Sequence, residues 1–161
     1  MDSVSEYITD YHYFEEVSAH PILGIIIFGV IGLMVYLSVT IIHGFPRGVM
    51  IFIALLLVFI YSNFMKLKIT ISSKSLTVGF GVIKHSIRLE NIEYIETRHP
   101  AWYWYGGLGI RFGWDWSTGF IQNFRRGVRV TPKRGRRIYF STNNPDAIVN
   151  IVNDLLEKMK K

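Results

Sequence analysis

Two long uncharged apolar stretches constrain the fold of this chain more than any other feature of its sequence. The first runs from Pro21 to Ile42 and the second from Gly48 to Met65. About 20 apolar residues allow an α-helix to cross a hydrocarbon core of roughly 30 Å. The short segment between the stretches contains Gly44 and Pro46, which favour a tight reversal. Residues 21–65 are therefore predicted to form a transmembrane hairpin with helices over about 21–42 and 48–64. A buried helix pair in a soluble protein would need a larger polar shell than the rest of the chain provides.

The charges are segregated along the chain. Residues 1–20, expected to form an acidic N-terminal tail, carry five Asp and Glu residues and no Lys or Arg. From Lys66 onward there are 17 Lys and Arg residues against 7 acids, a net charge of +10 that favours anionic partners. Lys66, Lys68 and Lys74 follow the second apolar stretch, whereas Arg47 is the one basic residue of the loop. The positive-inside rule then predicts an integral protein of the cell membrane with both termini cytoplasmic.

The hydrophobic period changes to two after the second stretch, which is typical of β-strands. Leu67, Ile69 and Ile71 alternate with polar residues, and Leu76, Val78 and Phe80 do so after a serine-rich turn. These segments predict a β-hairpin. Further strands are expected over Ile83–Leu89, Ile92–Arg98, Leu108–Phe112, Phe120–Phe124, Gly127–Thr131 and Arg137–Ser141. Because the connections are too short for helical crossovers, the sheet is predicted to be antiparallel.

The chain ends in a predicted amphipathic helix over about 145–160. Pro145 suits the first helical position, and Ile148, Val152, Leu155 and Met159 fall on one face. After about seven short strands, such a helix is expected to cover the open end of a small barrel or sandwich. The fold class is therefore α+β: a transmembrane hairpin, followed over residues 66–161 by an antiparallel β-barrel or sandwich capped by a helix.

Several strings in residues 66–161 resemble the pleckstrin-homology-like (PH-like) domains of bacterial and archaeal membrane proteins. They are the opening hairpin Leu67–Phe80, Ser86–Glu93, Gly106–Arg111, Gly127–Val130 and the helix start Asn144-Pro145-Asp146. The resemblance implies a seven-stranded, helix-capped fold that usually binds a ligand rather than catalysing a reaction. It implies no specific ligand.

A basic stretch is the strongest candidate binding site. Seven cations fall within thirteen residues without an acid: Arg125, Arg126, Arg129, Lys133, Arg134, Arg136 and Arg137. Arginine forks suit phosphate recognition. Alternation is expected to turn Val128 and Val130 inward and Arg129 outward. Lys133 to Arg136 are expected to crowd the turn and so to build a compact patch close to the membrane. The patch fits an anionic lipid surface, an acidic protein partner, or a solvated hairpin whose charges only maintain topology.

Aromatic residues form a second candidate surface. They are Trp102, Tyr103, Trp104, Tyr105, Trp114 and Trp116, in a segment interrupted by glycines. Such rings suit the lipid headgroup level, the core of the domain, or a contact in a homo-oligomer. Stacking on single-stranded nucleic acid is disfavoured for a chain tethered to a membrane.

Metal, cofactor and catalytic signatures are weak. His12, Glu16 and His20 would share one helical face, but a polar segment with incidental histidines explains them better. No metal and no cofactor are expected. The chain has no phosphate-binding loop, no metalloprotease motif and no nucleophile elbow, and its apolar stretches carry no Asp, Glu, Lys or Arg. We therefore expect a non-enzymatic, membrane-anchored PH-like module whose basic surface takes anionic lipid headgroups or an acidic protein. The alternatives are an oligomerising scaffold subunit and a regulatory partner of a membrane enzyme.

Overall fold

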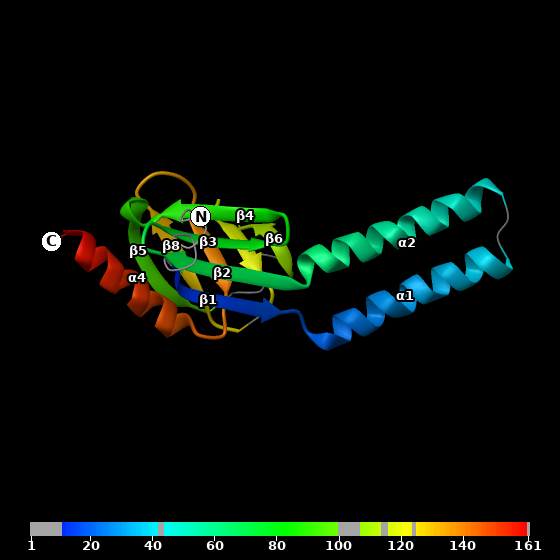
Figure 1. Ribbon diagram of the computed structural model, residues 1–161, viewed down its shortest axis with the longest axis horizontal. Coiled ribbons are helices and arrows are strands. Elements are labelled where there is room, and N and C mark those ends of the chain that lie inside the picture. The colour runs from blue at the N-terminus through cyan, green and yellow to red at the C-terminus, as the bar shows by residue number, and fades with distance from the viewer. Residues whose placement is uncertain (1–10, 42–43, 100–106, 114–115, 124, 161) are drawn as a thin grey trace, which may run out of the picture. The chain divides into compact units, whose positions relative to one another are not determined.

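The computed structural model describes residues 11–41, 44–99, 107–113, 116–123 and 125–160 (Figure 1). The chain divides into two compact units. One is the helical hairpin, Ala19–Met65. The other, here called the sheet unit, is built from the chain on both sides of that hairpin.

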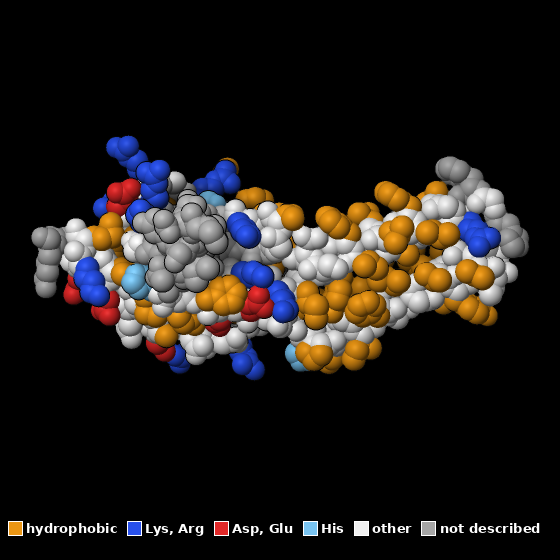
Figure 2. Space-filling model, in the orientation of Figure 1, with side chains coloured by type: hydrophobic (Ala, Val, Ile, Leu, Met, Phe, Trp, Pro, Cys, Tyr) orange, Lys and Arg blue, Asp and Glu red, His pale blue; other side chains and the backbone are white. Residues whose placement is uncertain are grey.

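The helical hairpin contains helices α1, Pro21–Thr40, and α2, Phe45–Phe64. Both are long and apolar enough to cross a membrane, as predicted. Figure 2 shows hydrophobic side chains spread over their surfaces. Helix α2 begins three residues before the predicted Gly48, because Pro46 lies in the first turn, where the missing N–H has no helical partner to lose.

The two helices pack through a small residue and an aromatic pair. The rings of Phe28 and Tyr61 meet edge to face with their centroids 5.1 Å apart. Gly24 is buried beneath the Tyr61 hydroxyl, which a Cβ at this position would strike. Glycine at position 24 therefore permits the close approach of α1 and α2.

A four-stranded antiparallel sheet opens the sheet unit. Its strands are β1, Tyr11–Ser18, β2, Lys66–Ser72, β3, Ser75–Phe80, and β4, Ile83–Arg88, arranged in that order. The alternating apolar residues of β2 and β3 are buried, which confirms the predicted hairpin.

Strand β1 was not predicted, because residues 1–20 were expected to form a polar tail. It pairs with β2 from Tyr11 opposite Ser72 to Ser18 opposite Lys66. The helical hairpin is therefore inserted between two neighbouring strands of one sheet. We call the end of the sheet that carries Ser18 and Lys66 the tether end, and the opposite end the far end.

The second sheet has five strands in the order β5-β8-β9-β7-β6. They are β5, Ile92–Arg98, β6, Gly109–Phe112, β7, Thr118–Ile121, β8, Gly127–Pro132, and β9, Ile138–Ser141. Strands β7 and β9 are parallel, so the prediction of a wholly antiparallel sheet is wrong. The parallel pair needs no helical crossover, because strand β8 runs back between β7 and β9 in the sequence. Strand β9 then pairs with β8 on one side and with β7 on the other.

The two sheets form stacked layers, with helix α4, Pro145–Lys160, beside β5 and β8 (Figure 1). The predicted C-terminal helix is confirmed, and its Ile148, Val152 and Leu155 are buried. The turn of 3₁₀-helix η1, Leu89–Asn91, connects the sheets. The described part of the chain holds nine strands, eight of them within residues 66–161, where about seven were predicted, and neither sheet is closed.

Candidate functional site: a basic cleft

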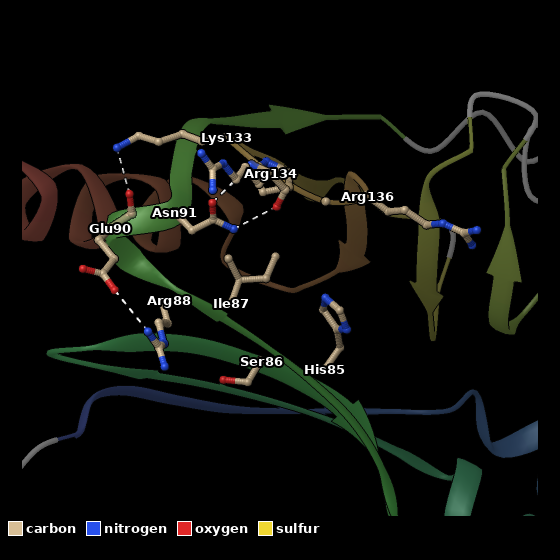
Figure 3. Close-up of a pocket in the computed structure, with 11 residues that line it drawn as sticks. His85, Ser86, Ile87, Arg88, Glu90, Asn91, Lys133, Arg134 and Arg136 are labelled. Carbon is tan, nitrogen blue, oxygen red and sulfur yellow. Dashed lines mark hydrogen bonds and ion pairs between the residues drawn. The ribbon is translucent and has the colours of Figure 1, made fainter.

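A basic cleft of about 720 Å³ lies between edge strand β4 and the turn that joins β8 to β9. Residues 85–88, 90–91 and 132–136 line it (Figure 3). Its charged lining comprises Arg88, Lys133, Arg134 and Arg136 against Glu90 alone, with His85 beside them. The cleft therefore concentrates positive charge contributed by both sheets.

One residue, Asn91, holds the β8–β9 turn in place. Its Nδ2 donates to the carbonyl oxygen of Arg134 at 2.9 Å, and its Oδ1 accepts from the backbone N–H of Arg134 at 3.2 Å. Its carbonyl oxygen also accepts from the backbone N–H of Lys133 at 2.7 Å. Three hydrogen bonds from one residue fix the backbone that carries the cations, so little ordering is required when an anion binds.

The cations of the cleft are only weakly neutralised. Arg88 and Glu90 approach to 3.6 Å, but both side chains are mostly exposed, and such a pair contributes little in water. The ammonium of Lys133 donates to the carbonyl oxygen of Glu90 at 2.8 Å. Among the described residues, no carboxylate forms an ion pair with Lys133, Arg134 or Arg136. The cleft thus retains donors for a phosphate or a carboxylate.

Arg136 links the basic cleft to the predicted aromatic surface. Its guanidinium carbon lies 6.0 Å from the ring centroid of Phe112 and 5.7 Å from that of Trp116. Figure 3 shows its side chain extending away from the turn. Trp116 is 76% exposed and adopts a left-handed backbone conformation, with φ of 59°. An exposed cation–π cluster therefore lies at one end of the cleft.

The other predicted basic residues lie outside the cleft. Arg129 projects from β8 between the buried Val128 and Val130, as the alternation predicted. Arg125 and Arg126 are exposed before the opposite end of β8, about 20 Å along the strand from Lys133. Arg137 is exposed but does not line the cleft. The basic residues are therefore divided between the two ends of β8, with Lys133, Arg134 and Arg136 at the β8–β9 turn.

Five of the predicted aromatic residues lie outside the described part of the chain. They are Trp102, Tyr103, Trp104, Tyr105 and Trp114. Among the predicted aromatics, Trp116 alone is placed by the structure.

A second polar cluster anchors strand β1. The carboxylate of Glu15, 8% exposed, accepts hydrogen bonds from the Thr142 hydroxyl at 2.5 Å, the Asn143 backbone N–H at 2.8 Å and the Tyr13 hydroxyl at 2.8 Å. The pKa of Tyr13 is raised to about 12, mainly by burial of the hydroxyl and in second place by its hydrogen bond to Glu15. Glu15 therefore fastens the strand before the helical hairpin to the loop before α4.

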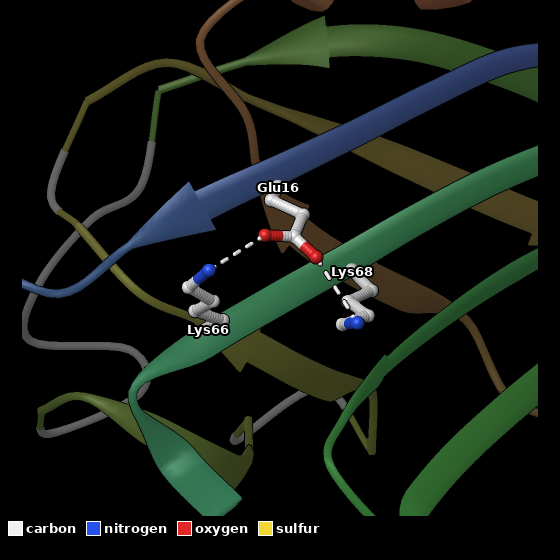
Figure 4. A network of polar contacts seen from close by, with 3 residues as sticks. All are labelled: Glu16, Lys66 and Lys68. Atoms are coloured by element: carbon white, nitrogen blue, oxygen red, sulfur yellow. Dashed lines mark hydrogen bonds and ion pairs between the residues drawn. The ribbon is translucent and has the colours of Figure 1, made fainter. Parts of the chain in front are cut away.

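Glu16 points to the other side of β1 and meets two lysines (Figure 4). Its carboxylate oxygens each lie 3.0 Å from one ammonium, that of Lys66 or Lys68. Hydrogen bonds from these two lysines lower the pKa of Glu16. The metal hypothesis assumed that His12, Glu16 and His20 share a helical face, but residues 11–18 form a strand. Within the described residues, no group of three His, Asp or Glu side chains is arranged to hold a metal ion.

The sequence did not identify His85, Arg88 and Asn91 as candidate site residues. His85 and Arg88 read as ordinary members of an alternating strand, and Asn91 as a turn residue. Their role depends on how one sheet packs against the other, and no short-range pattern encodes that packing.

Comparison with known proteins gives no relative from which an activity could be transferred. No protein-family model, no curated protein and no solved structure matches the chain.

Proposed function

We propose that this protein is a membrane-anchored, non-enzymatic module that presents its basic cleft to an anionic group. The group is a lipid headgroup phosphate or a carboxylate-rich protein segment. The observation that carries the proposal is the cleft itself, where Arg88, Lys133, Arg134 and Arg136 surround one cavity with a single acid in its lining.

The anchor in this proposal is the helical hairpin. Helices α1 and α2 have the length and composition of membrane spans, and Gly24, Ser38 and Ala54 are their buried residues among those described. Strands β1 and β2 precede and follow the hairpin and pair with each other, which requires an even number of crossings. The lysines at 66, 68 and 74 favour a cytoplasmic sheet unit in the cell membrane.

A PH-like classification of the sheet unit belongs to the same proposal. Two stacked sheets followed by a C-terminal helix support it. Strand β1 and the parallel β7–β9 pair depart from the seven-stranded antiparallel pattern that the resemblance implies.

The test uses the full chain in nanodiscs made of a neutral phosphatidylcholine. A fluorescent octaglutamate peptide is titrated, and fluorescence anisotropy reports binding. We expect binding that weakens with salt and falls at least tenfold in an Arg134→Ser/Arg136→Ser variant. The matched control is Arg125→Ser/Arg126→Ser, which removes the same charge outside the cleft. Equal losses in both variants, or no binding by the wild type, would contradict the proposal.

The same titration separates the two sources of the anion. Wild-type protein is also placed in nanodiscs containing phosphatidylglycerol. If lipid headgroups occupy the cleft, the anionic bilayer blocks the peptide in the wild type. If binding persists there, the cleft is open to an acidic protein segment.

A further inference from the structure

The turn between β3 and β4 exposes apolar side chains. Val82 is 77% exposed and Ile83 is 47% exposed, and Gly81 supplies the positive φ of the turn. The turn between β2 and β3, at the far end of the same sheet, carries Ser73 and Lys74 instead. The two turns of one sheet thus differ in polarity, and an exposed apolar pair at a loop tip needs an explanation.

The strand register places the apolar turn at the tether end. Leu67 of β2 is opposite Phe80 of β3, and Phe80 is opposite Ile83 of β4. Ile83 therefore lies two strand spacings, about 10 Å, from the start of β2. Lys66, the first residue of β2, directly follows Met65, the C-cap of helix α2. The turn and both chain connections to the hairpin consequently share one end of the sheet.

We infer that the Gly81–Val82 turn inserts Val82 and Ile83 into the headgroup–acyl boundary of the membrane. The inference rests on the proposed spanning of the membrane by α1 and α2. A spanning helix ends at the surface of the bilayer, so residues close to that end lie next to lipid. Burial of apolar side chains at this boundary is favourable. The exposed Lys84 follows the turn and supplies a cation for anionic headgroups.

Insertion of the turn would determine how the sheet unit stands on the membrane. The connections at Ser18 and Lys66 belong to neighbouring strands, so alone they act as a narrow hinge. A third contact about 10 Å to the side opposes rocking about that hinge. Strand β4 runs from this contact into the basic cleft, which His85 and Arg88 line. Arg88 is opposite Ser75 at the far end of the sheet, about 17 Å along β4 from Ile83. The inserted turn therefore holds this part of the cleft away from the lipid, which favours the carboxylate-rich protein segment as its anion.

The experiment uses single-cysteine reporters, because the natural chain has no cysteine. Val82→Cys in the full chain is labelled with the environment-sensitive dye NBD and reconstituted into liposomes with nitroxide-labelled lipids. Because Val82 is mostly exposed, the cysteine removes little packing. The matched control is Lys74→Cys, an exposed position in the turn at the far end.

We expect a blue-shifted emission and at least twofold stronger nitroxide quenching at position 82 than at position 74. Equal quenching at the two positions, or stronger quenching at position 74, overturns the inference. Carbonate extraction of the same liposomes tests the anchor separately. If extraction removes the protein, the proposed anchoring has failed; if it stays while position 82 is unquenched, only the inserted turn has failed.

Discussion

Replacing Glu15 by Ala tests the fastening of strand β1 to the loop before α4. The substitution removes the acceptor of the Thr142 hydroxyl, the Asn143 backbone N–H and the Tyr13 hydroxyl. A hydrogen bond to a charged group contributes about 1.5–3 kcal/mol, and a buried donor left without a partner costs about 1–3 kcal/mol. Tyr13 is only partly buried and can turn to water, and the Thr142 oxygen still accepts from the Asn144 N–H. We therefore expect the free energy of unfolding to fall by about 2–4 kcal/mol.

The measurement is thermal unfolding of the full chain in neutral detergent, followed by tryptophan fluorescence. For a unit of this size, each kcal/mol lowers Tm by roughly 4 °C, so Glu15→Ala lowers Tm by about 8–16 °C. The neighbouring Glu16→Ala is the control, because its ion pairs with Lys66 and Lys68 are open to solvent and contribute little to stability. A Glu15→Ala variant that loses no more stability than Glu16→Ala would refute the reasoning.

Three further predictions follow from single residues. Asn91→Ala removes the two side-chain hydrogen bonds to Arg134 and leaves the backbone bond to Lys133, so octaglutamate affinity in neutral nanodiscs should fall several-fold. Unchanged affinity would show that the β8–β9 turn keeps its shape without the Asn91 side chain. Tyr13 has a folded pKa of about 12, above its ordinary 10, so the folded state binds the proton more tightly and stability is lost as pH rises from 10 to 12. Unfolding curves of Tyr13→Phe should lack that loss, and an equal alkaline loss in both proteins would count against the assignment. Gly127→Ala places a Cβ against the Tyr139 side chain and the Phe140 carbonyl oxygen, which should cost about 1–3 kcal/mol in thermal unfolding, whereas Gly48→Ala in open space should cost almost nothing.

The elements that the sequence predicts well are those whose burial follows a local period. Leu67, Ile69 and Ile71 occupy alternate positions on one buried face, and the two apolar helices need only length and composition. Strand β1 has the same alternation, with Tyr13, Glu15 and Val17 on one face, but the middle residue is a carboxylate. A charge at an inward position argues against a strand unless its partners are known. Here the partners are Thr142 and Asn143, at the other end of the sequence.

The candidate site was predictable only in part, for a similar reason. The density of cations at 133–136 is visible in the sequence, and the structure places three of them around one cleft. Arg88 joins them because β4 is an edge strand beside the β8–β9 turn, which depends on how the sheets pack. The parallel pairing of β7 and β9 was missed because short connections were taken to exclude parallel neighbours, whereas strand β8 returns the chain between β7 and β9.

The insertion of the helical hairpin between β1 and β2 has a consequence for biosynthesis. Strand β1 is made first, but its partner leaves the ribosome only after both helices have been synthesised. In the proposed topology, with both termini cytoplasmic, the first strand waits unpaired in the cytoplasm while the membrane insertion machinery handles the hairpin. Strands β1 and β2 can then pair only if both helices cross the membrane, so that the two strands lie on the same side. A hairpin that crosses only once would separate β1 from β2 and leave the edge of β2 open to aggregation and proteolysis.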